Sequence, residues 1–234
     1  MIITLMAAAA AVATPAPATP PPESDFGFTY RYPATLARFP GLRHWLLADR
    51  DALHAKTARA AAAGKRDATA NGYPYRRYET QRDWKQVTQT PRFISLSMTQ
   101  YVFTGGAHGA PSSGALLWDK ATNQTRATTS LFTSGAALWQ AVRARYCPAL
   151  KAERARRMGD DATPGIAPAC PPLKDLTVLL GSTDGTAFDR IGLIADPYVA
   201  GAYVEGSYEV TLPVTPALIA AVKPAYRIAF AIPR

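Results

Sequence analysis

The chain is built largely from short segments in which apolar and polar residues alternate. In 26–32 an aromatic residue occupies every second position, which is the period of a half-buried strand. The same alternation in 92–103 places small hydroxyl residues opposite apolar ones, a pattern typical of a sheet with one face toward solvent. Further strands are predicted at 73–87, 115–118, 124–128, 176–180, 188–194, 208–214 and 226–230.

Other segments show apolar residues at spacings of three and four. Leu42, Leu46 and Leu53 predict a helix that runs through an alanine-rich tail to residue 63, with Gly64 as its stop. A second helix is expected after Ser134, interrupted at 147–148. Short further helical segments are expected at 151–158 and 216–222. Together these patterns predict an α+β fold with mostly antiparallel strands, about three or four helices and two similar-sized halves.

The N-terminus has the character of an export signal. Residues 2–12 are apolar and alanine-rich, and 14–22 carry many prolines, so 1–22 is interpreted as a signal peptide and spacer. No Lys or Arg stands near Met1, which departs from the usual signal. The alternative is an Ala/Pro tail on a cytoplasmic protein. No apolar run reaches the roughly 18 residues of a membrane span, so we expect a periplasmic or secreted protein without a transmembrane segment in the mature chain.

The cysteine content agrees with export. Cys147 and Cys170 are the only cysteines, and in an oxidising compartment such a pair is usually a disulfide. Closing a loop of this size contributes roughly 3 kcal/mol in the chain-entropy model. Two free buried thiols are the alternative.

The charge of the chain favours anionic partners. It carries 26 basic and 17 acidic residues, a net charge of +9, and such a field attracts polyanions. In a cell envelope these include lipopolysaccharide, acidic headgroups and peptidoglycan carboxylates, whereas nucleic acid is not expected. A solvated basic surface without a specific partner is the alternative. The candidate basic patch is Arg143, Arg145, Lys151, Arg154, Arg156 and Arg157.

Catalytic patterns are weak. The histidines His44, His54 and His108 lie at no metal-binding spacing, so no metal or cofactor is expected. No serine stands in Gly-x-Ser-x-Gly, and Ser112 and Ser113 near His108 lack an orienting acid in the sequence. We therefore lean toward a protein that is not an enzyme.

One glycine-rich turn and one later loop stand out. The turn is Tyr101-x-x-x-Gly105-Gly106-Ala107-His108, and the loop is Pro197-Tyr198-x-x-Gly201-x-Tyr203-x-Glu205-Gly206. The turn has two interpretations. It is a bend that needs positive φ with His108 bonded to nearby backbone, or a ligand-contacting loop in which His108 donates or stacks.

These motifs resemble the paired extracytoplasmic domains of RsiV-type anti-sigma factors, which sense lysozyme, and of PdaC-type peptidoglycan deacetylases, over roughly 26–230. The resemblance implies an envelope-facing module with a PdaC-like half at 23–108 and an RsiV-like half at 109–234. It implies candidate ligand-binding residues at Tyr101, Gly105, Gly106, His108, Tyr198, Tyr203 and Glu205.

The sequence thus favours a non-enzymatic, periplasmic or secreted module that binds peptidoglycan or another anionic envelope polymer. A lysozyme-binding or lysozyme-inhibiting protein is the first alternative. Because common lysozymes are basic, it would need a local acidic patch, with Asp184, Asp196, Glu205 and Glu209 as candidates. A cell-wall glycan hydrolase is the second alternative, and it would need clustered carboxylates or a Ser–His pair.

Overall fold

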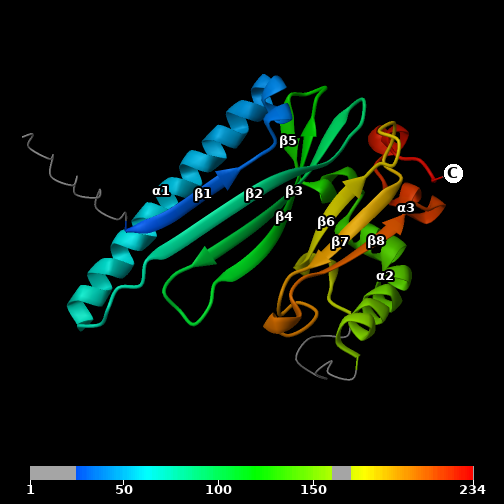
Figure 1. Ribbon diagram of the computed structural model, residues 1–234. Coiled ribbons are helices and arrows are strands. Elements are labelled where there is room, and N and C mark those ends of the chain that lie inside the picture. Colours follow the sequence, from blue (N-terminus) through cyan, green and yellow to red (C-terminus); the bar gives the residue numbers. More distant parts are fainter. Residues whose placement is uncertain (1–24, 160–169, 234) are drawn as a thin grey trace, which may run out of the picture.

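Two β-sheets organise the chain, and the computed structural model describes residues 25–159 and 170–233 (Figure 1). The first sheet has five strands in the order β1-β2-β3-β4-β5, with β1 parallel to β2 and all other neighbours antiparallel. The second has three antiparallel strands in the order β6-β7-β8. The predicted α+β class with mostly antiparallel strands is confirmed. The strands are β1 Phe26–Arg31, β2 Tyr78–Gln89, β3 Phe93–Phe103, β4 Ala110–Asp119, β5 Gln124–Arg126, β6 Leu176–Gly181, β7 Arg190–Ala195 and β8 Tyr208–Pro213.

Helices cover the sheets. The three α-helices of the described part are α1 Pro40–Asn71, α2 Gly135–Met158 and α3 Pro216–Ala221. Short 3₁₀ helices are η1 Ala34–Arg38, η2 Thr128–Leu131, η4 Leu173–Asp175, η5 Tyr203–Glu205 and η6 Pro224–Ala229. None of the helices in 25–159 and 170–233 is both long and apolar enough to cross a bilayer.

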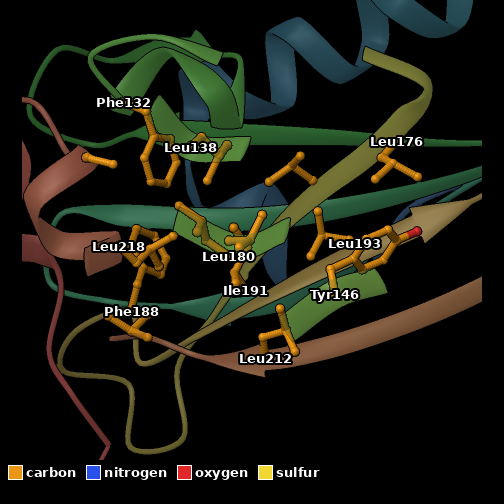
Figure 2. Close-up of a cluster of buried hydrophobic side chains, with 14 of the residues drawn as sticks. Phe132, Leu138, Tyr146, Leu176, Leu180, Phe188, Ile191, Leu193, Leu212 and Leu218 are labelled. Carbon is orange, nitrogen blue, oxygen red and sulfur yellow. The ribbon is translucent and has the colours of Figure 1, made fainter. Parts of the chain in front are cut away.

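The first sheet is buried on both faces at the start of β3 and the end of β4. Ile94 and Leu96 point into a core closed by Leu42 and Leu46 of α1, because α1 lies along that face of the sheet (Figure 1). Their neighbour Phe93 alternates to the other face, as side chains of a strand do. There it joins the core formed with α2 and the second sheet. Figure 2 shows this larger core around Phe132, Tyr146, Phe188, Ile191, Leu193 and Leu212.

The predicted end of the first helix at Gly64 is wrong. Helix α1 continues to Asn71 and ends at Gly72, which has a φ of 70° and closes the helix in the left-handed conformation. Gly64 serves a packing role, because the ring of Tyr78 lies where a Cβ at position 64 would be. A glycine that permits close approach inside a helix resembles a stop signal in the sequence.

Two further expectations were wrong. Helix α2 continues through Pro148, because Leu138, Val142, Tyr146 and Leu150 are buried at helical spacing on both sides of the proline. The strand expected at 226–230 is instead η6. Pro224 starts it, and Ile228 is 91% exposed, so the alternation there does not mark a buried strand face.

The predicted disulfide is present. Cys147 on α2 bonds Cys170, with their Cα atoms 5.3 Å apart. The bond attaches the segment that precedes β6 to the middle of α2. The expected signal peptide and spacer at 1–22, and most of the loop expected at 159–172, lie outside the described residues.

The predicted division at 108/109 stays a prediction, and the first sheet runs across it. Strand β4 begins at Ala110 and pairs with β3 along nearly its whole length, from Val102↔Ala110 to Phe93↔Asp119. Residues on either side of the division therefore share one sheet.

A buried carboxylate joins the strands at the far end of this sheet. Asp119 is 0% exposed, and its oxygens accept hydrogen bonds from Arg92 at 3.1–3.2 Å and from Arg126 at 2.9 Å. The ring of Tyr226 lies against both guanidinium groups. Burial alone would raise the pKa of Asp119, but the two arginines lower it overall.

We predict that Asp119→Ala lowers the free energy of unfolding by about 3 kcal/mol, because removing one member of a buried ion pair leaves the others uncompensated. Urea denaturation at neutral pH measures the change. Asp175→Ala is the matched control: its pair with Lys174 is exposed, and we expect a change within about 0.5 kcal/mol. Equal effects of the two substitutions would contradict the structural role of Asp119.

Candidate functional site

The turn after β3 meets the loop between β7 and β8. Tyr203 of that loop donates its hydroxyl to the carbonyl oxygen of Gly109 at 2.9 Å. The ring of His108 stacks on Tyr203 with centroids 4.0 Å apart and planes 28° apart. His108 Nδ1 donates to the Gly109 carbonyl at 2.9 Å, because that oxygen can only accept. With Nδ1 as the donor, Nε2 is an acceptor in the neutral form of the imidazole.

Two more tyrosines extend this surface. Tyr198 has its ring centroid 5.8 Å from that of Tyr203, and 57% of the residue is exposed. Its φ of 71° lies in the left-handed region that a bulky side chain rarely adopts. Tyr101 packs its ring over Gly109, leaving no room for a Cβ there. We call His108, Tyr198 and Tyr203 the aromatic ledge.

A buried glutamate fixes the loop beneath the ledge. The Glu205 carboxylate accepts hydrogen bonds from the Tyr208 hydroxyl at 2.6 Å and from the Ala202 N–H at 2.7 Å, and it pairs with Arg154 at 3.4 Å. Burial raises the pKa of Glu205, but the bonds from Tyr208 and Ala202 and the charge of Arg154 outweigh it and lower the pKa overall. Gly201 lies against this carboxylate so closely that a Cβ would overlap it.

The two flanks of the loop are also anchored. At one flank, Arg157 donates to the carbonyl oxygens of Glu205 and Ser207, both at 2.9 Å, with its guanidinium 4.2 Å from the Tyr208 ring centroid. At the other flank, Asp196 accepts hydrogen bonds from the N–H and hydroxyl of Ser113 on β4, at 2.8 and 2.6 Å. The ledge is therefore a preorganised surface carried by a loop with fixed ends.

Five of the predicted ligand-binding residues come together here: Tyr101, His108, Tyr198, Tyr203 and Glu205. Glu205 supports the loop from inside, since only 1% of its side chain is exposed. Gly105 and Gly106 lie in the same turn, where their carbonyl oxygens accept hydrogen bonds from Arg76 at 3.1 and 2.7 Å.

The predicted basic patch has members with different surroundings. Arg154 and Arg157 contact the loop, as described above. Arg156 is exposed and pairs with Glu153 at 2.7 Å. Arg143, Arg145 and Lys151 are exposed along α2, and for these three no ion pair occurs within the described residues.

The other candidate chemistry does not converge on the ledge. Ser113 bonds Asp196 instead of His108. Asp184 accepts from the N–H and hydroxyl of Thr186, and Asp189 accepts from the Thr183 N–H. Within 25–159 and 170–233, no three His, Cys, Asp or Glu side chains are placed to hold a metal ion.

The sequence did not predict the contacts that anchor the loop between β7 and β8. Arg157 lies 48 residues from Glu205 and Ser113 lies 83 residues from Asp196 along the chain. No local pattern around Arg157 or Ser113 indicates such a distant partner. The local bonds of Glu205 could have been found, because Ala202 and Tyr208 are each three residues away.

We predict that Gly201→Ala destabilises the protein by about 1–3 kcal/mol, because the added methyl group must displace a buried, hydrogen-bonded carboxylate. Thermal unfolding measures the effect. Gly106→Ala is the control: its φ is not positive and no atom lies closer than 4.0 Å to the added Cβ. A destabilisation of similar size in the control would refute the packing argument.

We also predict that the stability advantage of the wild type over Glu205→Gln depends on pH. The folded-state pKa of Glu205 is lowered. The ionised carboxylate therefore contributes fully to the free energy of unfolding at any pH above its unfolded-state pKa, near 4.3. The advantage is lost as the pH falls through the folded value. Urea unfolding of both proteins between about pH 7 and pH 3 tests this. A difference that stays constant or grows in acid would contradict the assignment.

Comparison with known proteins gives one family match and distant structural likenesses. Residues 28–110 match the family model described as Deacetylase PdaC. A DUF3298 family protein from Pseudomonas aeruginosa is 21% identical to this chain, with a TM-score of 0.46. The match covers 73% of this chain and 72% of the Pseudomonas protein. A DUF3298 family member from Bacteroides fragilis is 15% identical, with a TM-score of 0.40. That match covers 73% of this chain and 62% of the Bacteroides protein.

No curated protein matches the chain. The matched segment runs from β1 through α1, β2, β3 and the glycine-rich turn to the first residue of β4. The RsiV-type resemblance of the remainder stays a prediction. Residues 28–110 are thus similar to the PdaC family model, and they include the motif at 101–108 that carried the PdaC-type resemblance in the sequence.

Proposed function

We propose that this protein is a non-enzymatic, periplasmic or secreted module that binds peptidoglycan or another anionic envelope polymer through the aromatic ledge. The observation that carries the proposal is the ledge itself. Tyr198 presents an exposed ring beside the stacked pair His108–Tyr203, on a loop fixed by Glu205, Arg157 and Asp196.

Aromatic faces suit a glycan ligand. A π-face carries negative partial charge, and a sugar ring offers a row of weakly positive C–H groups that can lie against it. The fixed loop lowers the ordering cost of binding, because the rings are already positioned in the free protein. The Nε2 atom of His108 adds one hydrogen-bond acceptor for a sugar hydroxyl or amide N–H.

The charge of the chain favours an anionic polymer over a neutral one. The net charge is +9, and Arg143, Arg145 and Lys151 line the exposed side of α2. Such charges raise the local concentration of an anionic polymer and speed its association. The aromatic ledge would then supply the specific contact.

The alternatives receive less support. Lysozyme binding requires an acidic patch, but three of the four candidates, Asp184, Asp196 and Glu205, accept hydrogen bonds within the fold. The fourth, Glu209, is exposed on β8. Glycan hydrolysis requires an acid–base pair near the bound sugar, and His108 has the Gly109 carbonyl as its partner instead of a carboxylate. The binding module is therefore the proposal that the contacts favour.

Co-sedimentation with insoluble peptidoglycan tests the proposal. We expect the wild type to pellet, and Tyr198→Ala to weaken binding about tenfold, because truncating an aromatic anchor of a binding surface costs more than about 1 kcal/mol, and about 1.4 kcal/mol is tenfold. Val204→Ala is the matched control, since Val204 is 85% exposed in the same loop. We expect it to bind like the wild type.

Salt separates the two contributions. Replacing Arg143, Arg145 and Lys151 together with Gln should weaken pelleting at low salt and flatten its salt dependence. The effect of Tyr198→Ala should persist at high salt. Absence of pelleting at both salt concentrations would exclude the peptidoglycan form of the proposal.

A further inference from the structure

A second aromatic surface lies beside the turn that carries His108. Where α1 ends, β2 begins and β3 ends, a surface hollow of about 300 Å³ is lined by Tyr73, Tyr75, Tyr78, Arg76 and the turn residues Gly105 and Gly106. None of these tyrosines belongs to the motifs that drew attention in the sequence. The hollow is large enough for one sugar ring and too small for a bulky side-chain cluster.

Two of these tyrosines have hydroxyls bonded to the protein, and the Tyr73 ring stays half exposed. The Tyr73 hydroxyl donates to the Asp67 carboxylate, and 50% of Tyr73 stays exposed. The Tyr75 hydroxyl donates to the Asp25 carbonyl oxygen at 2.8 Å. The ring centroids of Tyr75 and Tyr78 lie 5.5 Å apart. Partners that fix both hydroxyls preorganise the rings for stacking.

Gly64 lets this hollow form. Its Cα faces the Tyr78 ring so closely that a side chain would collide with it. Glycine within a helix lowers helix propensity, yet α1 continues through this position to Asn71. The close approach seats Tyr78 against the helix, and Gly64 and Tyr78 both line the hollow.

Arg76 supplies the charge. Its Nη1 donates to the Gly105 and Gly106 carbonyl oxygens at 3.1 and 2.7 Å, and the guanidinium lies 5.1 Å from the Phe103 ring centroid. These contacts hold the guanidinium still. No other hydrogen bond of Arg76 occurs among the described residues, which leaves Nε–H and Nη2–H as a parallel pair of donors. Such a pair matches the two oxygens of a carboxylate.

We infer that this hollow is a subsite for a carboxylate-bearing sugar ring, which stacks on Tyr73 while its carboxylate pairs with Arg76. The inference rests on the proposed function and extends it, because it names a second contact point and the chemistry of the sugar. The hollow and the aromatic ledge flank one turn, residues 104–109. A glycan chain that crosses the turn would engage both, and binding at one surface would raise the effective concentration at the other.

Soluble oligosaccharides test the inference by isothermal titration calorimetry. The acidic probe is a tetrasaccharide of alternating N-acetylglucosamine and N-acetylmuramic acid with free carboxylates. The neutral probe is the tetramer of N-acetylglucosamine. We expect Arg76→Gln to weaken binding of the acidic probe about tenfold, as loss of a charge-assisted bidentate contact does, and to change binding of the neutral probe less than about twofold. Tyr73→Ala should weaken binding of both probes by about fivefold or more, since stacking does not depend on the carboxylate.

Arg66→Gln is the matched control. Arg66 is exposed on α1, so the substitution removes the same charge without touching the hollow, and we expect binding of both probes to stay within about twofold. Arg76→Lys keeps the charge but removes the parallel pair of N–H donors, so it should also weaken binding of the acidic probe. Thermal unfolding of each variant verifies that the turn is intact.

The outcomes separate this inference from the proposed function. If Arg76→Gln and Arg66→Gln weaken binding of the acidic probe equally, the hollow contributes only a diffuse field and the inference fails. If Tyr198→Ala removes binding while Arg76→Gln and Tyr73→Ala do not affect it, the ledge binds alone; the inference fails and the proposed function stands. If the wild type binds neither probe nor insoluble peptidoglycan, the inference fails together with the peptidoglycan form of the proposed function.

Discussion

The rest of the structure depends on burial of both faces of the sheet where 93–96 of β3 pair with 116–119 of β4. Along β3, Ile94 and Leu96 enter the core under α1, while Phe93 enters the core under the second sheet. Leu117 and Trp118 of β4 divide between the two cores in the same way. A strand buried on both faces cannot shift by one residue without exchanging the two sets of side chains. The register therefore also determines where the turn that follows β3 meets the loop that carries Tyr198 and Tyr203.

Polar contacts then fix the loop between β7 and β8 in the position that this register gives it. The Asp196–Ser113 contact and the Arg157 contacts with the loop carbonyls join the second sheet to β4 and α2. Glu205 is buried among donors, so its charge stabilises the loop. The ionisable groups beneath the ledge therefore hold the loop in place, and the ledge itself is a group of stacked rings.

Much of this fold could be predicted from the sequence, because alternation and helical spacing report burial directly. The failures have local physical causes. Gly64 signals a helix end, but it serves the approach of Tyr78. Tyr226, Ile228 and Phe230 alternate, but Pro224 begins a 3₁₀ helix. The motifs singled out His108, Tyr198 and Tyr203, whose rings lie together in the structure. The pairing of Arg157 with the loop and the gathering of Tyr73, Tyr75 and Arg76 at the turn depend on contacts between distant segments, and no local pattern reports them.

The parallel pairing of β1 sets an order of assembly. Strands β2, β3, β4 and β5 follow one another as antiparallel neighbours, so short chain segments can bring them together. Strand β1 instead pairs Phe26 with Tyr78, which requires closing a loop that contains all of α1. The edge of the sheet is therefore expected to complete last, after the helix has docked. The hollow beside Tyr75, whose hydroxyl bonds Asp25 just before β1, would mature only at that late step.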